Sequence, residues 1–338
     1  MVNGTGILAG IITFATFIAT LFLTKAWIKV ARNFGLVGKD MNKLSNKKIA
    51  ESGGIAVIFS VVFGLFFYIF LKTFLLQTET HFIDLLAIAI TILLASFIGF
   101  LDDILGWKKG LAQWQKVLLT IPIAFPLAIL NSGHSIMNVP LFGMIDFGLI
   151  YPLIIVPLAI VGAANGYNML AGYNGLEAGL GAIILGTLGL VALKMGSTWL
   201  ALVAFIAVAA LLAFLLFNWY PAKVFPGDSL TYAIGALIAI IAILGNMEKL
   251  AAFLFIPFFI DALLYFKARI VDKAGDVQAF AKPNKDGTIY MPYSKIYDST
   301  HAAIWLQKKL FGKATEKKVT SMILIFELIL ATVAITLF

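Results

Sequence analysis

Cysteine is absent from the 338 residues, and charged residues make up only 12% of them. The first absence excludes disulfide bonds and thiolate metal sites. The second excludes an ordinary soluble domain, in which about a quarter of the residues are charged. The N-terminus also lacks the basic stretch that opens a cleavable signal peptide, so we expect its apolar run to be retained as a membrane span.

Apolar residues fill the space that charges leave, at 61% of the chain and a mean hydropathy of +0.99. A bilayer-spanning helix needs about 20 apolar residues in a row. We therefore predict an all-α, polytopic membrane protein that forms a single catalytic domain over 1–338, with a cytoplasmic loop over 267–318. About ten transmembrane helices are expected, at 5–27, 52–71, 83–101, 112–130, 149–164, 178–195, 198–217, 229–245, 249–266 and 319–338.

The basic residues are unevenly distributed along these runs. All but three of the 25 Lys and Arg residues, namely Lys72, Lys194 and Lys249, lie in the loops that follow odd-numbered spans or beside them. The positive-inside rule places those loops in the cytoplasm and both termini outside. The net charge of +8 is then explained by topology and by contact with anionic headgroups, without a nucleic-acid partner.

Two adjacent carboxylates, Asp102 and Asp103, end the third predicted span. Ionisable groups in or near a span usually mark function, and the dipole of a helix C-terminus disfavours negative charge. We expect a compensating cation, either a divalent metal or a lysine. The candidates are Lys108, Lys109 and Lys116. The alternative is a solvated carboxylate pair at the membrane interface.

The segment 165–181 holds three asparagines, Asn165, Asn168 and Asn174, together with five glycines. Asn165 and Asn168 would share one face of a helix, and Asn174-Gly175 predicts a turn. Asparagine carbonyls suit Mg²⁺, and glycines let backbone N–H groups approach phosphate. The alternative is a glycine-rich helix crossing followed by a turn.

Three further side chains lie where a predicted cytoplasmic loop meets a span. Asp228 immediately precedes the eighth span and is either an N-cap or a second oxygen ligand for a metal on Asn168. Phe225 offers a stacking surface for a base, or a membrane anchor. Glu51 is either a carboxylate favoured by the start of a helix or a ligand contact.

The last predicted cytoplasmic loop contains 11 Lys or Arg residues. Asp286-Gly287 between extended residues predicts a β-hairpin over 282–295. Lys282 and Lys285 could meet phosphate there or remain solvated loop charges.

All of these polar groups fall on one predicted face, which favours a Mg²⁺–phosphate site at the membrane surface. Phosphoryl transfer needs positioning and charge neutralisation more than a covalent partner. The rival hypothesis is a secondary transporter that uses the deeper Asp261 and Glu327. Transporters place their sites near the midplane, between repeats with broken helices. The polar motifs here gather at one edge and the two halves show no repeat, which favours the enzyme.

The motifs resemble those of the polyprenyl-phosphate N-acetylhexosamine-1-phosphate transferase superfamily, above all its eukaryotic and archaeal dolichyl-phosphate N-acetylglucosamine phosphotransferase branch. The resemblance spans nearly the whole chain and rests on five ordered segments. They are GKDMNKLSNKKIAES (38–52), LDDILGW (101–107), NGYNMLAGYNGLEAGLG (165–181), FNWYPAKVFPGDS (217–229) and KDGTIYMPYSK (285–295).

The resemblance implies transfer of GlcNAc-1-phosphate from UDP-GlcNAc to a polyprenyl (dolichyl) phosphate with release of UMP. In the family this is the first membrane step of lipid-linked oligosaccharide synthesis for N-glycosylation. It also implies Mg²⁺, with Mn²⁺ as a substitute, a cytosol-facing site and a homodimer. The same reaction with another UDP-N-acetylhexosamine is an open alternative.

The family's functional residues carry over to matching positions. In the family, one of the paired aspartates acts on the lipid phosphate, and a lysine that follows the pair contacts phosphate. The matching lysine of this chain lies several residues further from the pair than the family's lysine does. The implied residues are Asp102, Asp103 and Lys116 for catalysis, Asn168 and Asp228 for the metal, and Met41, Glu51, Asn165, Asn174, Phe225 and Lys282 for substrate, with Asn174 and Phe225 at the uracil.

The chain departs from the family before the hairpin. Eukaryotic members carry an Arg/His cluster there, whereas this chain has AFAKPN at 279–284 with Lys282 as the sole basic residue. Lysine is a point charge and lacks arginine's bidentate fork. The bacterial His-rich motif is also absent. The missing cluster and the compact chain favour an archaeal plasma membrane, with the site facing the cytoplasm, over the endoplasmic reticulum.

Overall fold

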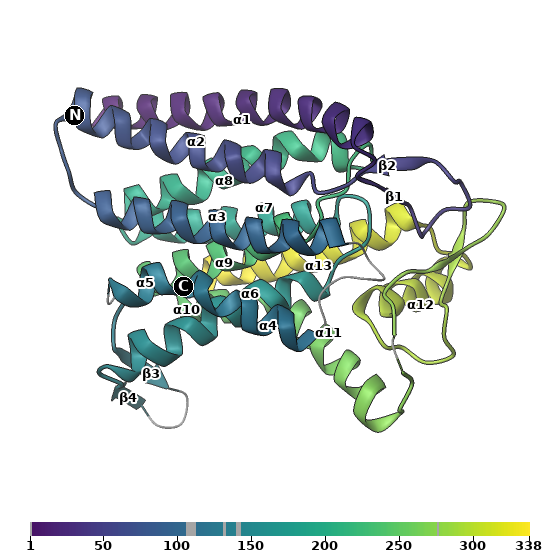
Figure 1. Ribbon diagram of the computed structural model, residues 1–338. Helices are drawn as coiled ribbons and strands as arrows, with labels where there is room; N and C mark the ends of the chain where they lie inside the picture. The colour runs from purple at the N-terminus through teal and green to yellow at the C-terminus, as the bar shows by residue number, and fades with distance from the viewer. Residues whose placement is uncertain (1, 106–112, 131–132, 140–142, 276) are drawn as a thin grey trace.

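The computed structural model describes residues 2–105, 113–130, 133–139, 143–275 and 277–338. Long helices dominate this part of the chain, as the apolar runs predict, because a backbone in lipid must satisfy its own hydrogen bonds. The first three are α1 (Val2–Asn33), α2 (Gly54–Leu71), which a π-helical turn η1 (Lys72–Leu76) extends, and α3 (Phe82–Leu105). Figure 1 shows them side by side along one side of the bundle.

The fourth apolar run is broken into short pieces, α4 (Gln113–Thr120), the 3-10 turn η2 (Ile121–Ala124) and α5 (Phe125–Ile129). Proline stands near the start of both later pieces, where its missing N–H is tolerated. A hairpin of β3 (Ile136–Val139) and β4 (Gly143–Asp146) follows, and then η3 (Tyr151–Ile155) with α6 (Val156–Met169).

Helix α9 (Asp228–Leu244) lies at the centre of the bundle. Every residue from Ser229 to Ile243 is buried, as expected for a helix that is apolar on all sides. It packs against α2, α3, α6, α7 (Leu176–Lys194) and α8 (Thr198–Asn218). The start of α9 is therefore surrounded by several other helices.

The chain ends with α10 (Glu248–Leu254), α11 (Ile256–Phe266) with the π-helical turn η4 (Lys267–Val271), α12 (Ser299–Phe311) and α13 (Glu316–Leu337). The predicted ninth span is bent by 58° between α10 and α11. Between η4 and α12, β5 (Lys282–Pro283) pairs antiparallel with β6 (Ile289–Tyr290). The predicted hairpin is thus confirmed, with Gly287 at a φ of +80° in its turn.

The prediction of an all-α, polytopic membrane protein is confirmed, but its ten spans are not all of spanning length. Among the described residues, seven helices are long and apolar enough to cross a membrane, and the bent pair makes an eighth. The runs at 114–129 and 228–244 form shorter apolar helices. Prolines interrupt the first of these, and Gly227 and Gly245 bound the second.

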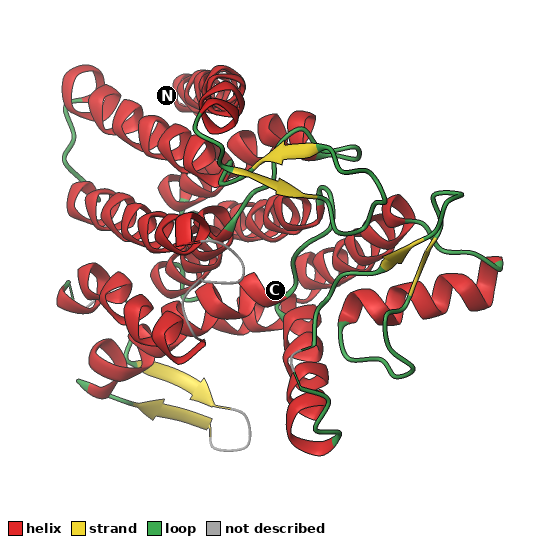
Figure 2. Ribbon diagram, turned by 45° about the vertical axis from the view of Figure 1, so that its right-hand side comes forward, coloured by secondary structure: helices red, strands yellow, loops and turns green. Residues whose placement is uncertain are grey.

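Three features of the described chain were not expected. Two are the pair of β1 (Val37–Lys39) with β2 (Lys48–Ala50) and the β3–β4 hairpin; Figure 2 shows how short all the strand pairs are beside the helices. The third is α12. Its signals are in the sequence, since Asp298 caps it through Thr300 N at 2.7 Å and Gly312 ends it at a φ of +72°, both common at helix ends.

The described loops that follow odd-numbered predicted spans gather at one end of the bundle. Figure 1 shows β1, β2 and α12 at that end, and β3 and β4 at the other. The segments that carry most of the basic residues therefore lie together, which agrees with the sorting of charge in the sequence.

Candidate active site

The paired aspartates meet the start of α9. Asp103 accepts hydrogen bonds from the backbone N–H of Asp228, at 2.8 Å, and of Ser229, at 3.4 Å. The first N–H groups of a helix have no partners within it, and their dipoles favour a carboxylate. Asp103 therefore caps α9. The N-cap position belongs to Gly227 and has no side-chain hydrogen bond, so the interpretation of Asp228 as an N-cap is wrong.

Lys116 supplies the cation that we expect beside the paired aspartates. Its Nζ lies 2.5 Å from Asp102 Oδ2 and 3.1 Å from Asp228 Oδ2. The Asp102 side chain is only 8% exposed and that of Asp228 is 23% exposed, so this ion pair is partly shielded from solvent. The alternative lysines Lys108 and Lys109, with Trp107, lie outside the described residues.

Helices α3 and α9 approach each other closely at Gly99. A Cβ added at this position would overlap the backbone of Asp228 and lie 2.5 Å from the backbone nitrogen of Ser229. Backbone cannot move aside as a flexible side chain can. Glycine at this position therefore allows Asp103, one helical turn further on, to reach the first turn of α9.

We expect Gly99→Ala to weaken this helix contact and to lower transfer activity. The added methyl group must push α9 away from α3, and overpacking of this kind costs about 1–3 kcal/mol. Thermal unfolding of the purified protein and initial rates measured together test this prediction. Gly162→Ala on α6, where a Cβ meets nothing within 4 Å, is the matched control. Equal stability and rates in both variants would contradict the prediction.

Asn168 and Asp228 are brought together, as predicted. Thr231 Oγ1 donates to Asn168 Oδ1 at 2.7 Å and lies 3.3 Å from the carbonyl oxygen of Asp228. One hydroxyl group thus contacts the last turn of α6 and the first turn of α9. The two residues that the sequence proposes as metal ligands are neighbours at one end of the bundle.

The donor set at this position suits a hard divalent cation. Asp102, Asp103 and Asp228 with Lys116 carry an excess of negative formal charge, and a carboxamide oxygen is close by. Within the described parts of the chain, no three His, Cys, Asp or Glu side chains form a metal-holding group. Magnesium commonly binds one or two protein carboxylates and completes its shell with phosphate and water, so Asn168 and Asp228 fit that pattern.

Glu51 and Phe225 lie beside this acidic site. The backbone of the 50–54 segment pairs with 225–226 through three bonds of 2.8 Å, from Phe225 N to Ala50 O, Gly53 N to Phe225 O and Gly54 N to Pro226 O. Burial raises the pKa of the Glu51 carboxyl, and the negative charge of Asp228 raises it further. The backbone pairing with residues 225–226, just before Asp228, brings Glu51 near the acidic site.

Asn165 faces a different neighbour from Asn168. Its Nδ2 donates to Thr120 Oγ1 at 3.0 Å and to Val161 O at 2.9 Å. The carboxamide therefore ties α6 to the end of α4, the helix that carries Lys116. In the structure, Asn165 positions elements of the site through this contact.

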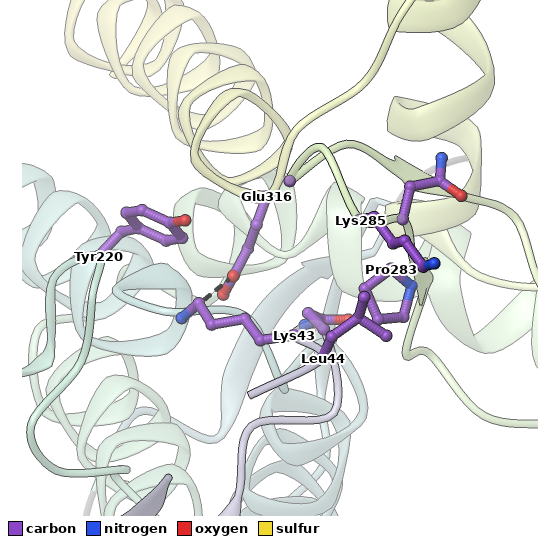
Figure 3. Close-up of a pocket in the computed structure, with 9 residues that line it drawn as sticks. Lys43, Leu44, Tyr220, Pro283, Lys285 and Glu316 are labelled. Atoms are coloured by element: carbon purple, nitrogen blue, oxygen red, sulfur yellow. Dashed lines mark ion pairs between the residues drawn. The ribbon is translucent and has the colours of Figure 1, made fainter. Parts of the chain in front are cut away.

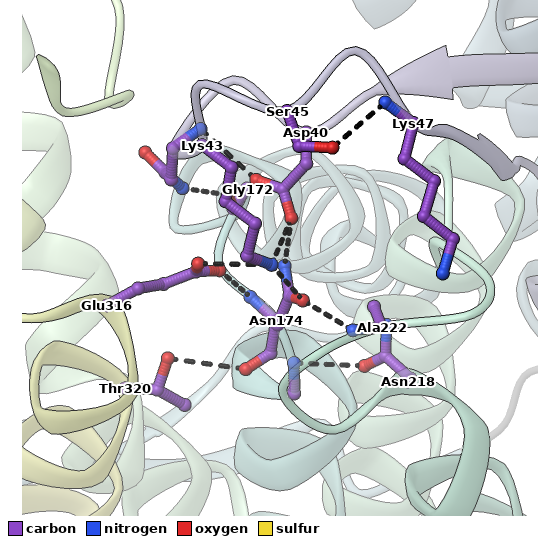
Figure 4. Close-up of polar contacts among 12 residues, drawn as sticks. Asp40, Lys43, Ser45, Lys47, Gly172, Asn174, Asn218, Ala222, Glu316 and Thr320 are labelled. Carbon is purple, nitrogen blue, oxygen red and sulfur yellow. Dashed lines mark hydrogen bonds and ion pairs between the residues drawn. The ribbon is translucent and has the colours of Figure 1, made fainter. Parts of the chain in front are cut away.

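Asn174 is the centre of a buried polar network (Figure 4). Its Oδ1 accepts from Ala222 N at 2.7 Å and from Lys43 Nζ at 3.0 Å, and its Nδ2 donates to Asp40 Oδ2 at 3.1 Å. Glu316 Oε1 accepts from Asn174 N at 3.1 Å. The carboxamide is thus engaged with the protein on both sides. Sequence reasoning missed Asp40, Lys43 and Glu316, which no local pattern distinguishes from loop charges.

A small cavity of about 180 Å³ lies beside this network. It is lined by residues 42–44, Tyr220, residues 283–285 and Glu316. Figure 3 shows Lys43 reaching Glu316, a contact of 3.3 Å, and the Lys43 Nζ also lies 4.4 Å from the centre of the Tyr220 ring. Met41 is 37% exposed, and Lys282 is exposed at the edge of the adjoining hairpin.

The two acids of the transporter hypothesis lie apart from these residues. Asp261 Oδ1 accepts from Ser299 N at 2.7 Å and so holds the start of α12. Glu327 is buried on α13, and neither of its oxygens bonds to another described residue. Transporters also have broken helices like the bent pair α10 and α11. However, the Asp261 carboxylate on α11 is occupied by its contact with the start of α12.

The helices and the acidic site together describe a polytopic membrane protein with three aspartates and a lysine gathered at one end of its bundle. Residues 85–246 match glycosyl transferase family 4. A protein of Sulfolobus acidocaldarius is 35% identical over 308 residues, covering 87% of this chain and 90% of its own length. A protein of Saccharolobus solfataricus is 34% identical over 320 residues, covering 94% of this chain and 92% of its own length.

Both archaeal relatives carry the provisional name UDP-N-acetylglucosamine–dolichyl-phosphate N-acetylglucosaminephosphotransferase. A phospho-N-acetylmuramoyl-pentapeptide-transferase of Halalkalibacterium halodurans is 32% identical over 262 residues, covering 73% of this chain and 78% of its own length. The chain belongs to glycosyl transferase family 4, as the resemblance of its motifs implies.

Proposed function

We propose that this protein transfers N-acetylglucosamine 1-phosphate from UDP-GlcNAc to a polyprenyl (dolichyl) phosphate and releases UMP. The reaction is the first membrane step in building a lipid-linked oligosaccharide for N-glycosylation. The observation that carries the proposal is the meeting of Asp102, Lys116 and Asp228 within ion-pair distance at one end of the helices. Archaeal relatives with this named activity over almost the whole chain support it.

The proposed reaction forms one P–O bond and breaks another. An oxygen of the ionised lipid phosphate attacks the β-phosphorus of UDP-GlcNAc, and the bond to the UMP phosphate oxygen breaks, so the leaving group is UMP. Lys116, oriented by Asp102 and Asp228, meets the lipid phosphate and offsets its charge. Asp103 holds the start of α9 in place through its two backbone contacts.

A divalent cation fits the remaining oxygens. We assign its protein ligands to Asn168 Oδ1 and the Asp228 carboxylate, with Mg²⁺ as the resident ion and Mn²⁺ as a substitute. When bound, such an ion neutralises the diphosphate and the departing UMP. Thr231 holds the Asn168 oxygen toward α9.

Removal of divalent metal is expected to stop the reaction. Excess EDTA should lower UMP release by at least about a hundredfold, because charge neutralisation of the diphosphate is lost. Added Mg²⁺ should restore the rate, and Mn²⁺ should restore part of it. Isothermal titration of the apo protein with Mg²⁺ provides a readout independent of turnover. Full activity after exhaustive chelation would refute the assignment of a metal.

The substrate contacts are assigned from the positions that match the family's motifs. Phe225, Glu51 and Met41 bound the nucleotide end, and Lys282 meets the diphosphate. Asn174 acts at the uracil end by holding the surrounding backbone through its network. We further propose a site facing the cytoplasm of an archaeal plasma membrane, and a homodimer.

Purified protein in detergent, given UDP-GlcNAc and dolichyl phosphate, should release UMP only when both substrates are present. The relative that transfers phospho-N-acetylmuramoyl-pentapeptide makes other UDP-N-acetylhexosamines the proper comparison. UDP-GlcNAc should give a higher kcat/KM than UDP-GalNAc or UDP-MurNAc-pentapeptide. Preference for one of the latter would change the substrate but keep the reaction. No UMP from any of them would refute the proposal.

A further inference from the structure

Asn42 joins two segments that are far apart in the sequence. It lies in the loop between β1 and β2, with only 3% of its surface exposed. Its Oδ1 accepts from Ala281 N at 2.9 Å, and its Nδ2 donates to Gly172 O at 2.9 Å. Gly172 follows the asparagines of α6, and Ala281 precedes Lys282. One carboxamide therefore connects the membrane-embedded motif to the hairpin of the 267–318 loop.

The loop that carries Asn42 is itself held firmly. Asp40 Oδ1 accepts from Asn42 N at 3.1 Å, while Asp40 Oδ2 lies 2.5 Å from Lys43 Nζ. Lys43 also reaches Glu316 at 3.3 Å and Asn174 at 3.0 Å (Figure 4). Satisfied buried networks of this kind are rigid. Asn42 therefore presents its carboxamide from a fixed position.

The contact with Ala281 determines where Lys282 stands. Ala281 is buried and Lys282 is exposed, as expected for consecutive residues of an extended strand. On the other strand, Ile289 N donates to Ala314 O at 2.9 Å and anchors the hairpin independently. The ring of Phe280 fills the space above Gly172, 2.8 Å from where a Cβ would be. Lys282 is paired with Tyr290 of β6, and Thr300 Oγ1 donates to Ala279 O at 3.0 Å. Loss of the Asn42 bonds would thus loosen the backbone at Ala281, directly before Lys282, and leave the hairpin attached.

We propose that Asn42 is a positioning residue that fixes Lys282 relative to the Asn165–Asn174 motif and thereby sets affinity for the UDP-sugar. The inference rests on the proposed function. A lysine is a point charge on a flexible stem, so its placement on a diphosphate depends on the backbone that carries it. In this chain, the backbone before Lys282 is set by a side chain from a different loop.

Two variants separate hydrogen bonding from packing. Asn42→Ala removes the carboxamide, and Asn42→Leu removes it while keeping a side chain that branches at the same atom and has the same number of heavy atoms. Both should raise the KM for UDP-GlcNAc about tenfold, because a lost buried hydrogen bond is worth about that factor. The kcat and the KM for dolichyl phosphate should stay unchanged. Asn33→Ala, an exposed asparagine at the end of α1, is the control and should match the wild type.

A double-mutant cycle tests whether Asn42 acts through Lys282. Lys282→Ala alone should raise the KM for UDP-GlcNAc, and adding Asn42→Ala should change it no further, because coupled residues are not additive. Additive effects, a rescue by Asn42→Leu, a loss shared by both substrates, or failure of both Asn42 variants to fold would each overturn the inference. A wild type that releases no UMP would instead refute the proposed function.

Discussion

Asp228→Asn is expected to lower kcat by about a thousandfold or more, as loss of a metal-binding charge that stabilises the transition state would. The substitution is nearly isosteric, and the amide oxygen still accepts from Lys116. The start of α9 keeps its cap, because Asp103 bonds to the backbone at residue 228 and not to its side chain. UMP release with UDP-GlcNAc and dolichyl phosphate at saturating Mg²⁺ measures the effect.

The stability of this variant separates a chemical role from a structural one. Its thermal unfolding should stay close to that of the wild type, and its affinity for Mg²⁺ should fall. Glu79→Gln, an exposed acid in the loop between α2 and α3, is the matched loss of charge and should leave the rate unchanged. A rate for Asp228→Asn within tenfold of the wild type would remove Asp228 from the metal site.

Lys116→Met should affect both stability and turnover. Among the described residues, Lys116 is the cation that pairs with Asp102 and Asp228. When a partly buried ion pair loses one partner, the charge of the other partner is left uncompensated. We expect the free energy of unfolding to fall by about 3 kcal/mol. We also expect kcat to fall by about a hundredfold or more, because the charge that meets the phosphate is gone.

Lys116→Arg separates these two effects. It keeps the positive charge between the carboxylates, so most of the stability should return. Turnover should remain reduced, because the broad guanidinium cannot occupy the place of a compact ammonium. Denaturant unfolding in detergent and UMP release, measured on the same preparations, decide the point. A Met variant as stable as the wild type would mean that the ion pair does not neutralise the acidic site.

The helices could be predicted because a bilayer leaves the backbone few options, so each long apolar run is helical in the structure. What apolarity alone did not reveal was where helices break. Pro257 lies near the start of α11 after the bend, and prolines divide the run at 113–129. Helix α12 was missed because it is polar, although Asp298 and Gly312 mark both of its ends.

Part of the site could also be predicted. The polar motifs lie where odd-numbered spans end and even-numbered spans begin, and all of these positions must lie at the same face of the membrane. That reasoning placed Asp102, Asp103 and Asn168 near Asp228. It could not find the network around Asn174. Asp40 and Lys43 lie in a loop whose composition is typical of a solvated basic surface, and their burial depends on Glu316, more than 270 residues away. Contacts at that separation leave no local pattern.

Mass spectrometry of the lipid product from UDP-GlcNAc and dolichyl phosphate decides whether a sugar phosphate, and not a sugar alone, moves to the lipid. We expect GlcNAc joined to the lipid through a diphosphate, with UMP formed in equal amount. A lipid product with a single phosphate, accompanied by UDP, would refute phosphoryl transfer.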